Sequence, residues 1–227
     1  MTLSHMMKRL LATILPFLAT SCDERPKAND KVRLLDPKQI LFTLPTLCDA
    51  APAVMAAPVP AGARLLHEDD WRQIEFVSSK NYDHIQKELE KLAAFKREHQ
   101  RGIGWTSVYV RKEHATPLAA VGLQFASMPV LPASAVALSG HLVRDGFALS
   151  SGGEWFIYGQ RTGEGGILHL SVSQAHSACP KEIAQVLVQI AQTGQLLLVD
   201  WYAGAVVDTS SADSVLGWSR RYSSQTP

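Results

Sequence analysis

The sequence predicts an α+β fold, in which two amphipathic helices pack on a mainly antiparallel β-sheet. Two segments, 81–100 and 180–194, repeat apolar residues at steps of three and four, the spacing of one helix face. Several shorter segments alternate apolar and polar residues, as half-buried strands do. A Gly-rich stretch at 161–166 (RTGEGG) separates two of these segments and predicts a hairpin turn.

The first elements expected along the chain are two strands separated by a long loop. Residues 40–44 are apolar enough to form a short strand, and the Ala- and Pro-rich stretch 50–63 predicts an extended surface loop. In WRQIEFVS, residues 71–78, alternation places Ile74 and Phe76 on one face of a strand.

A long helix and two further strands are expected next. The apolar stripe of the helix over 81–100 consists of Tyr82, Ile85, Leu89, Leu92 and Phe95. Gly102 suits its C-terminal cap. Residues 105–112 then predict a strand with Val108 and Val110 on its apolar side, and 118–126 predict another.

The second half of the chain repeats this mixture. Residues 135–143 and 146–151 have the pattern of strands, and the Gly-rich turn joins two more. Pro180 suits the first turn of the second helix. Residues 195–210 then predict two strands around a tight turn at Ala203 and Gly204.

These elements predict a single α+β domain over residues 35–227, with two possible sub-lobes at 65–127 and 137–227. The stretch 128–135 (MPVLPASA) interrupts the pattern and would join the sub-lobes. The two helices begin about one hundred residues apart, which would fit an internal duplication. A helix packed on antiparallel sheet is also the usual arrangement of α+β folds.

The N-terminal residues 1–21 have the layout of a secretory signal. Lys8 and Arg9 form a short cationic region, an apolar run of about ten residues follows, and small residues precede Cys22. The apolar run is too short to span a bilayer, which needs about 20 residues. We therefore expect residues 1–21 to be a signal peptide and the polar residues 22–34 to be a tether.

The end of this segment, Leu18-Ala19-Thr20-Ser21-Cys22, resembles the lipobox of bacterial lipoproteins. The resemblance implies that Cys22 is acylated and anchors the chain to the inner or outer membrane, on the periplasmic side, in a Gram-negative bacterium. Ordinary cleavage nearby, which would release the protein into the periplasm, is the alternative.

Three cysteines are present, and this number bears on the export prediction. If Cys22 carries lipid, Cys48 and Cys179 remain as an even pair in an oxidising compartment, and we expect them to form a disulfide. The alternative is two separate buried thiols.

Composition and motifs exclude several classes of function. The formal charge of +1 becomes −1 once Lys8 and Arg9 are removed, so no general attraction to nucleic acid is expected. The sequence contains no motif of a hydrolase elbow, a zinc protease, a phosphate-binding loop or a dinucleotide site. We therefore predict no catalytic residues, no metal site and no cofactor.

Three segments are candidates for binding a protein partner. The densest acidic cluster is HEDD at 67–70, the strand at 105–111 offers an amphipathic strip, and the predicted hairpin has a charged tip. The candidate residues are His67, Glu68, Asp69, Asp70, Trp105, Tyr109, Arg111, Arg161 and Glu164.

An exported domain that lacks catalytic motifs suggests a non-enzymatic protein binder. Our specific hypothesis is an immunity protein, which neutralises a toxin acting in the periplasm by occluding its active site. One alternative is a hydrolase acting on cell-wall material, with His67, Asp69 or His169 as catalytic groups. Another is a glycan- or solute-binding module of the envelope.

Overall fold

A seven-stranded, fully antiparallel β-sheet organises the fold in the computed structural model, which describes residues 46–99, 108–173 and 177–223. The strand order is β13-β12-β4-β11-β10-β9-β6. These strands are β4 (Ile74–Ser78), β6 (Ala133–Ser134), β9 (Gly146–Leu149), β10 (Ile157–Arg161), β11 (Ile167–Val172), β12 (Leu196–Asp200) and β13 (Ala205–Val207).

Two smaller sheets accompany it. The order of the four-stranded sheet is β2-β8-β7-β3, with β2 (Val54–Met55), β3 (Arg64–Leu66), β7 (Val136–Leu138) and β8 (His141–Val143). In the two-stranded sheet, β1 (Thr46–Cys48) pairs in parallel with β5 (Tyr109–Arg111). The mixed composition of helices and mainly antiparallel sheet confirms the α+β class.

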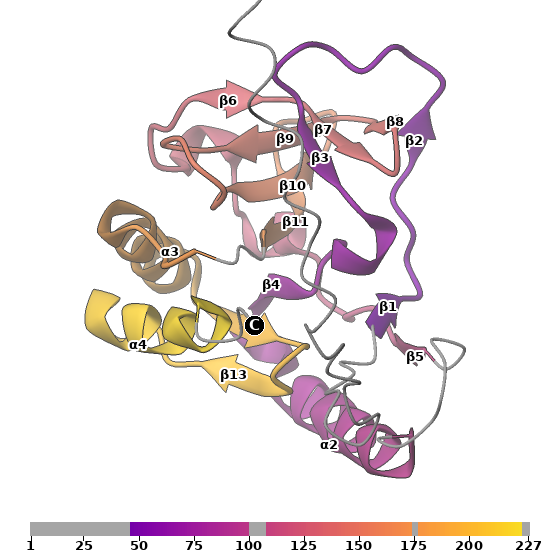
Figure 1. Cartoon of the computed structure of the whole chain (residues 1–227), viewed down its shortest axis with the longest axis vertical. Helices are drawn as coiled ribbons and strands as arrows, with labels where there is room; N and C mark the ends of the chain where they lie inside the picture. The colour runs from indigo at the N-terminus through magenta and orange to yellow at the C-terminus, as the bar shows by residue number, and fades with distance from the viewer. Residues whose placement is uncertain (1–45, 100–107, 174–176, 224–227) are drawn as a thin grey trace, which may run out of the picture. The chain divides into compact units, whose positions relative to one another are not determined.

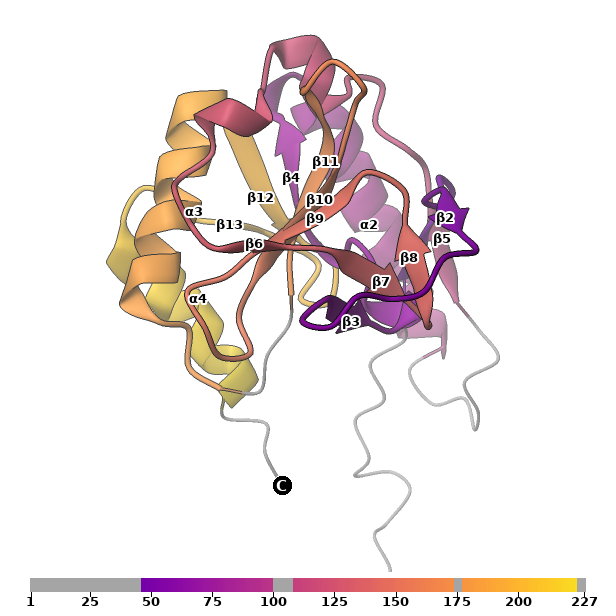
Figure 2. The same cartoon turned by 90° about the horizontal axis from the view of Figure 1, so that it is seen from above.

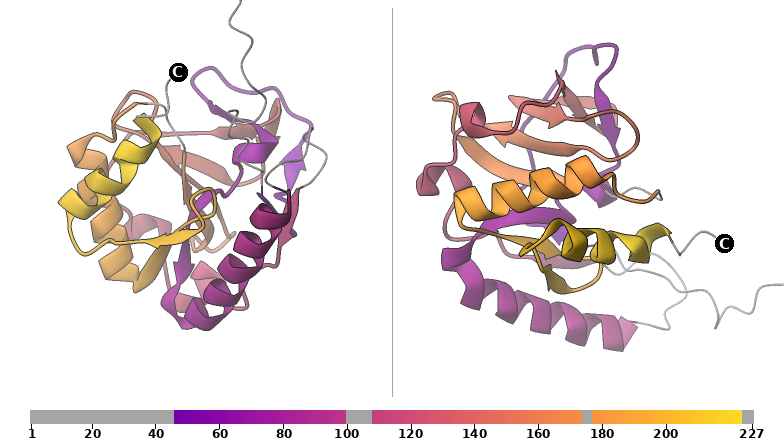
Figure 3. Two further views of the ribbon diagram at one scale, coloured as in Figure 1. Left: turned by 60° about the horizontal axis from the view of Figure 1, so that its bottom comes forward. Right: turned by 90° about the vertical axis from the view of Figure 1, so that its left-hand side faces the viewer.

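In the described part of the chain, three α-helices cover the two faces of the large sheet (Figures 1 and 2). Helices α3 (Lys181–Gly194) and α4 (Ala212–Ser223) lie side by side on one face, and α2 (Tyr82–His99) lies on the other (Figure 3). Short 3-10 helices fill the connections: η3 (Glu68–Asp70), η4 (Ser79–Asn81), η5 (Leu118–Val121) and η6 (Phe125–Ser127).

The core is divided among these layers. The largest cluster packs α3 and α4 against the sheet and includes Phe76, Leu170, Leu187 and Trp218. A second cluster packs α2 on the opposite face and includes Val77, Ile85, Leu92 and Trp201. Since Phe76 and Val77 are neighbours in β4, the alternation that predicted this strand is confirmed, but both of its faces are buried.

A third cluster joins the small four-stranded sheet to the large one. It contains Trp71, Val136, Phe156 and Tyr158, and the Trp71 and Tyr158 rings lie 5.3 Å apart. Trp71 precedes β4 and Tyr158 lies in β10, so this cluster fixes the start of β4 against the rest of the sheet.

Both predicted helices and the Gly-rich hairpin are confirmed. Helix α2 buries Ile85, Leu89 and Leu92 of the expected stripe. Strands β10 and β11 pair across the 161–166 turn, where Gly165 has a φ of +81°, a conformation that favours glycine. Pro180 is the N-cap of α3 rather than a residue of its first turn.

Several expectations about single elements were wrong. Residues 118–126 form two 3-10 helices instead of a strand, because Gly122 at φ +83° ends the first of them. Helix α4 was not expected at all. Its buried residues Val215, Trp218 and Tyr222 have helical spacing, but Gly217 and several Ser and Arg residues dilute the apolar pattern.

The two possible sub-lobes do not exist as separate sheets. Strand β4 comes from residues 65–127, yet it lies between β12 and β11, which both come from 137–227. All the described residues fall within one unit of the chain, residues 42–227.

Some expectations concern residues outside those described. They are the signal peptide at 1–21, the lipidation of Cys22, the tether at 22–34, the strand at 40–44, and Gly102 and Trp105. Among the described helices, none has the length and apolar character needed to cross a membrane.

Candidate functional site

The most unusual feature of the described residues is a buried carboxylate, Glu75, in β4, an interior strand of the large sheet. Its side chain is fully buried and accepts hydrogen bonds from Arg72 Nε (2.7 Å), Trp201 Nε1 (2.9 Å) and His114 Nε2 (3.0 Å). Arg111 Nη2 lies 3.5 Å away. Burial would raise the pKa of Glu75, but the neighbouring charges of Arg72, His114 and Arg111 hold it well below its usual range.

Arg72 connects this carboxylate to a second one. Its two terminal nitrogens donate to the two oxygens of Glu113, at 2.7 and 3.1 Å, in a bidentate pair. Arg72 is nearly fully buried and has a φ of +58°, a left-handed conformation that costs free energy in a non-glycine residue. The Tyr158 hydroxyl stabilises this conformation by accepting from the Arg72 backbone N–H at 2.8 Å.

Arg111 completes the group, which we call the Glu75 cluster: Arg72, Glu75, Arg111, Glu113 and His114. The Arg111 guanidinium is fully buried, donates to Thr46 Oγ1 and to the Arg72 carbonyl, and lies over the Trp201 ring at 4.8 Å. The cluster therefore ties β5 and the segment after it to β4, while Thr46 adds β1.

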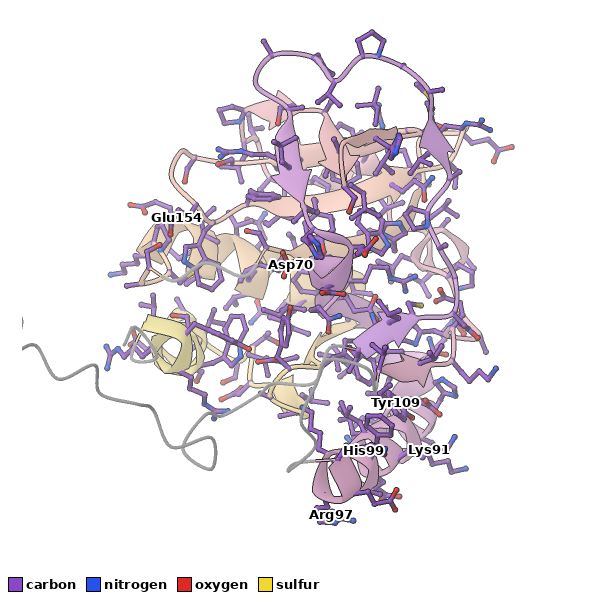
Figure 4. All side chains as sticks on the ribbon, turned by 45° about the vertical axis from the view of Figure 1, so that its right-hand side comes forward. Asp70, Lys91, Arg97, His99, Tyr109 and Glu154 are labelled. Carbon is purple, nitrogen blue, oxygen red and sulfur yellow. The ribbon has the colours of Figure 1, made fainter. Side chains whose placement is uncertain are left out.

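The predicted binding strip on the strand at 105–111 is corrected by this arrangement. Val110, expected to face inward, is 54% exposed, whereas Arg111 is 0% exposed. The inversion follows from the charge of Glu75, because a buried carboxylate next to Arg111 stabilises the buried guanidinium. Tyr109 is half-buried over α2, where its hydroxyl donates to Glu88 (Figure 4).

A cavity of about 270 Å³ lies beside the Glu75 cluster. Strands β4 and β11 pair only at Phe76–Leu170 and Glu75–Ser171, so their remaining residues diverge. Side chains from the 113–118 segment and the hairpin complete the walls. The lining residues are Ala50, Ala51, Arg72, Phe76, Val77, Glu113, His114, Thr116, Pro117, Leu118, Gln160, Leu168 and His169.

His169, a catalytic group in the hydrolase alternative, lies in the wall of this cavity and is buried. Its Nε2 lies 3.2 Å from Gln160 Oε1, and its ring packs edge-on against Trp71 at 5.1 Å. Burial and the nearby charge of Arg72 lower the pKa of His169 to about 3, so its ring is neutral at neutral pH.

This burial predicts a pH dependence of stability. Between pH 6.5 and 3 the unfolded chain protonates His169 and the folded protein does not, so the free energy of unfolding should decrease as the pH falls. The contribution of one such group is about 1.4 kcal/mol per pH unit. Urea denaturation between pH 7.5 and 5 measures this slope.

A variant isolates the contribution of His169. His169→Phe should decrease the slope of unfolding free energy against pH by about 1.4 kcal/mol per pH unit, the contribution of one proton. His141→Phe, at an exposed site in β8, should leave the slope unchanged. Equal slopes for wild type and His169→Phe would contradict the assignment. Below about pH 4.5 a further loss is expected, because the pKa of Glu113 is lowered to about 2 by Arg72 in spite of its burial.

The acidic segment at 67–70 forms an exposed, braced turn, which we call the acidic turn. Its last three residues form η3, and His67 Nδ1 accepts from the Asp69 backbone N–H. Tyr158 donates to the Asp70 carbonyl at 3.0 Å, and Tyr202 donates to Asp70 Oδ1 at 3.0 Å. Asp70 and the short helix that carries it lie on the near side in Figure 4.

The charged hairpin tip is also exposed, but it lies elsewhere. Arg161 lies 5.0 Å over the Phe125 ring, and Glu164 is exposed in the turn. Because β11 is antiparallel to β4, the tip that precedes β11 lies at the opposite end of the strands from the acidic turn, which precedes β4. The two candidate segments therefore do not form one continuous patch.

The expected disulfide between Cys48 and Cys179 is not formed, because both residues are free thiols in different surroundings. Cys48 lies in β1, and its thiol is 3.3 Å from Glu113 Oε2. Cys179 is buried in the large core cluster next to α3. Desolvation raises the pKa of Cys48 to about 11 and that of Cys179 to about 12, so both thiols are protonated.

This assignment predicts slow alkylation of two thiols. In native protein at pH 8, Cys48 and Cys179 should react with iodoacetamide far more slowly than in urea, because only the thiolate is nucleophilic. Mass spectrometry of unreduced, urea-unfolded protein should then find both positions alkylated. If the two positions are alkylated only after reduction, Cys48 and Cys179 form the disulfide after all.

Cys48, Asp49 and Glu113 place their ligand atoms within 4.8 Å of one another, the spacing of a metal site. Three of the carboxylate oxygens that could coordinate a metal are already used as hydrogen-bond acceptors. Both Glu113 oxygens accept from Arg72, and Asp49 Oδ1 accepts from the Glu113 backbone N–H at 2.6 Å. A cation here would also meet the positive charge of Arg72, so the donor set does not fit a metal well.

The arrangement does not suit the hydrolase alternative either. His169 lines the cavity, but His67 and Asp69, the other suggested catalytic groups, do not. Cys48 approaches Glu113, but the pKa of the thiol is raised and that of the carboxyl is lowered, so the proton stays on sulfur. In the described residues, this region offers no activated nucleophile.

Sequence reasoning missed the Glu75 cluster. The one available signal was that Arg72 and Glu75, both charged, lie within the apolar strand segment 71–78. Their partners Arg111 and Trp201 are 36 and 126 residues from Glu75, so no local pattern could identify them.

The fold and the site define an α+β protein with a buried ionic cluster, an adjacent cavity and a braced acidic turn. No protein-family profile, curated protein or solved structure matches the chain.

Proposed function

We propose that this protein is an exported, non-catalytic protein binder, and specifically an immunity protein that neutralises a toxin acting in the periplasm. The observation that carries the proposal is the acidic turn, an exposed and charged segment whose backbone and Asp70 side chain are fixed by Tyr158 and Tyr202. A preorganised segment loses little conformational entropy on binding, which favours tight association.

The mechanism follows from the charge and the exposure of the turn. His67 and Glu68 are exposed, and Asp69 and Asp70 are half-buried beside them. Three carboxylates on one rigid turn complement a positively charged cleft. In this proposal the turn enters such a cleft in the toxin and blocks access to its active site, and the Glu75 cluster keeps the supporting strands rigid.

Export is part of the proposal and rests on the signal-like sequence before Cys22. In the lipidated form the protein is anchored to the inner or outer membrane of a Gram-negative bacterium and faces the periplasm. Firm anchoring requires more than one acyl chain, which the lipoprotein class supplies.

A substitution at Cys22 tests the anchor. Cys22→Ser should move the protein from the membrane fraction to the soluble periplasmic fraction, because the serine hydroxyl cannot be thioether-linked to the lipid. Cys48→Ser is the matched control and should leave the protein in the membrane fraction. Membrane association of Cys22→Ser equal to that of wild type would argue against lipidation.

Capture of the partner tests the binding function. Tagged full-length protein, expressed in its host, should retain one secreted or envelope protein when solubilised envelope extracts are passed over the tag resin and analysed by mass spectrometry. Expression of the chain should protect sensitive cells against that captured protein. A protein that captures no partner, or that gives no protection, is not an immunity protein.

A further inference from the structure

The cavity beside the Glu75 cluster has the size and the lining of a binding site. An apolar cavity of about 150 Å³ holds one benzene ring, so 270 Å³ has room for a substituted or bicyclic ring. Phe76, Val77 and Leu118 are buried residues of its wall, and Leu168 is exposed to solvent. Ligand sites typically combine such apolar walls with a few polar groups.

The polar wall does not suit an anion. Arg72 is the cationic guanidinium that lines the cavity, and each of its three side-chain nitrogens already donates to Glu75 or Glu113. These two carboxylates already neutralise the charge of Arg72, so an anionic ligand beside them would add an unbalanced negative charge near the protein interior, which is unfavourable.

The wall also offers an unused hydrogen-bond acceptor. Gln160 Nε2 donates to the Arg144 carbonyl, so Gln160 Oε1 faces His169 Nε2, which must carry the proton. The neutral ring then has a lone pair on Nδ1, and this buried atom has no hydrogen-bond partner among the described residues.

His114 also lines the cavity, and its Nε2 donates to the ionised carboxylate of Glu75. Among the described residues its Nδ1 has no hydrogen-bond partner either. A buried polar atom without a partner is uncommon in folded proteins, and on His169, whose ring is neutral, such an atom calls for a donor.

From these observations we infer that the cavity binds a flat aromatic group that carries one hydrogen-bond donor, such as a phenol or an indole. The apolar walls hold the ring, and its O–H or N–H donates to Nδ1 of the His169 imidazole. This inference does not depend on the proposed immunity function, because such a group could belong to a free small molecule or to a Tyr or Trp side chain of a partner protein.

Two small probes test the inference on the full chain. In saturation-transfer NMR, 4-methylphenol should bind saturably with a dissociation constant of about 1 mM or below, and about fivefold more tightly than toluene, the ratio for one neutral hydrogen bond. A merely apolar cavity would give the reverse order, since toluene is the more hydrophobic probe. Absence of saturable 4-methylphenol binding, or equal or tighter binding of toluene, would overturn the inference.

Variants identify the acceptor. His169→Phe should decrease the preference for 4-methylphenol over toluene, whereas His141→Phe, outside the cavity, should retain it. Circular dichroism establishes whether each variant is folded. If His169→Phe does not fold, the comparison of the two probes on wild type still decides the inference.

Two further measurements distinguish the sources of the aromatic group. An aromatic compound extracted from protein purified from its host indicates a free ligand. Competition between 4-methylphenol and a captured partner protein indicates a side chain of that partner. Either result supports the site, and each assigns a different occupant to it.

Discussion

Replacing Glu75 by Gln should lower the free energy of unfolding by about 3–5 kcal/mol, the usual effect of removing one partner from a buried ion pair. The amide cannot balance the charges of Arg72 and Arg111, which are 4% and 0% exposed. It also cannot accept from Arg72, His114 and Trp201 at once, so at least one buried donor loses its partner.

Urea denaturation at pH 7 measures this effect, and Glu90→Gln on the exposed face of α2 is the control. The control should change the free energy of unfolding by less than about 0.5 kcal/mol. An equally small effect of Glu75→Gln would mean that the Glu75 cluster does not stabilise the fold. If Glu75→Gln cannot be isolated in folded form while Glu90→Gln can, the expected destabilisation is supported.

Replacing Asp200 by Asn should weaken the attachment of helix α4 or of the turn after β12 and lower the free energy of unfolding by about 2–4 kcal/mol. Asp200 is fully buried at the end of β12, and its Oδ2 accepts from both Trp218 Nε1 and the Tyr222 hydroxyl. Its Oδ1 accepts from the Ala203 backbone N–H at 2.8 Å. Because Asn has only one side-chain oxygen, it can serve either α4 or the turn, but not both.

The same denaturation experiment, followed by tryptophan fluorescence, measures the Asp200→Asn effect. Asp213→Asn is the matched control, since Asp213 is exposed in the first turn of α4. Loss of its interaction with the helix dipole should cost about 1 kcal/mol or less. Equal effects of the two substitutions would contradict the role of Asp200 as the anchor of α4.

The elements that could be predicted from sequence are those whose signal is local. The stripe of α2 and the Gly-rich turn between β10 and β11 depend on residues within a few positions of one another. Helix α4 depends instead on Trp218 and Tyr222 reaching Asp200, a contact across about 20 residues that periodicity does not reveal.

The candidate site was less predictable than the fold for the same reason. Alternation in β5 correctly separates Val110 from Arg111, but it assigns the apolar residue to the interior. Only the position of Glu75 on β4, a strand of another sheet, determines that the guanidinium is buried. The acidic turn was predicted because its charge density is visible in four consecutive residues, whereas its bracing by Tyr158 and Tyr202 comes from distant strands.

The affinity of two charge-reversal variants for the captured partner tests the proposed function most directly. Glu68→Lys changes an exposed residue of the acidic turn, and Glu164→Lys makes the same change at the hairpin tip, at the other end of the sheet. We predict that Glu68→Lys weakens binding at least about tenfold and that Glu164→Lys binds as wild type does. Unchanged binding by Glu68→Lys, or a loss confined to Glu164→Lys, would contradict recognition through the acidic turn.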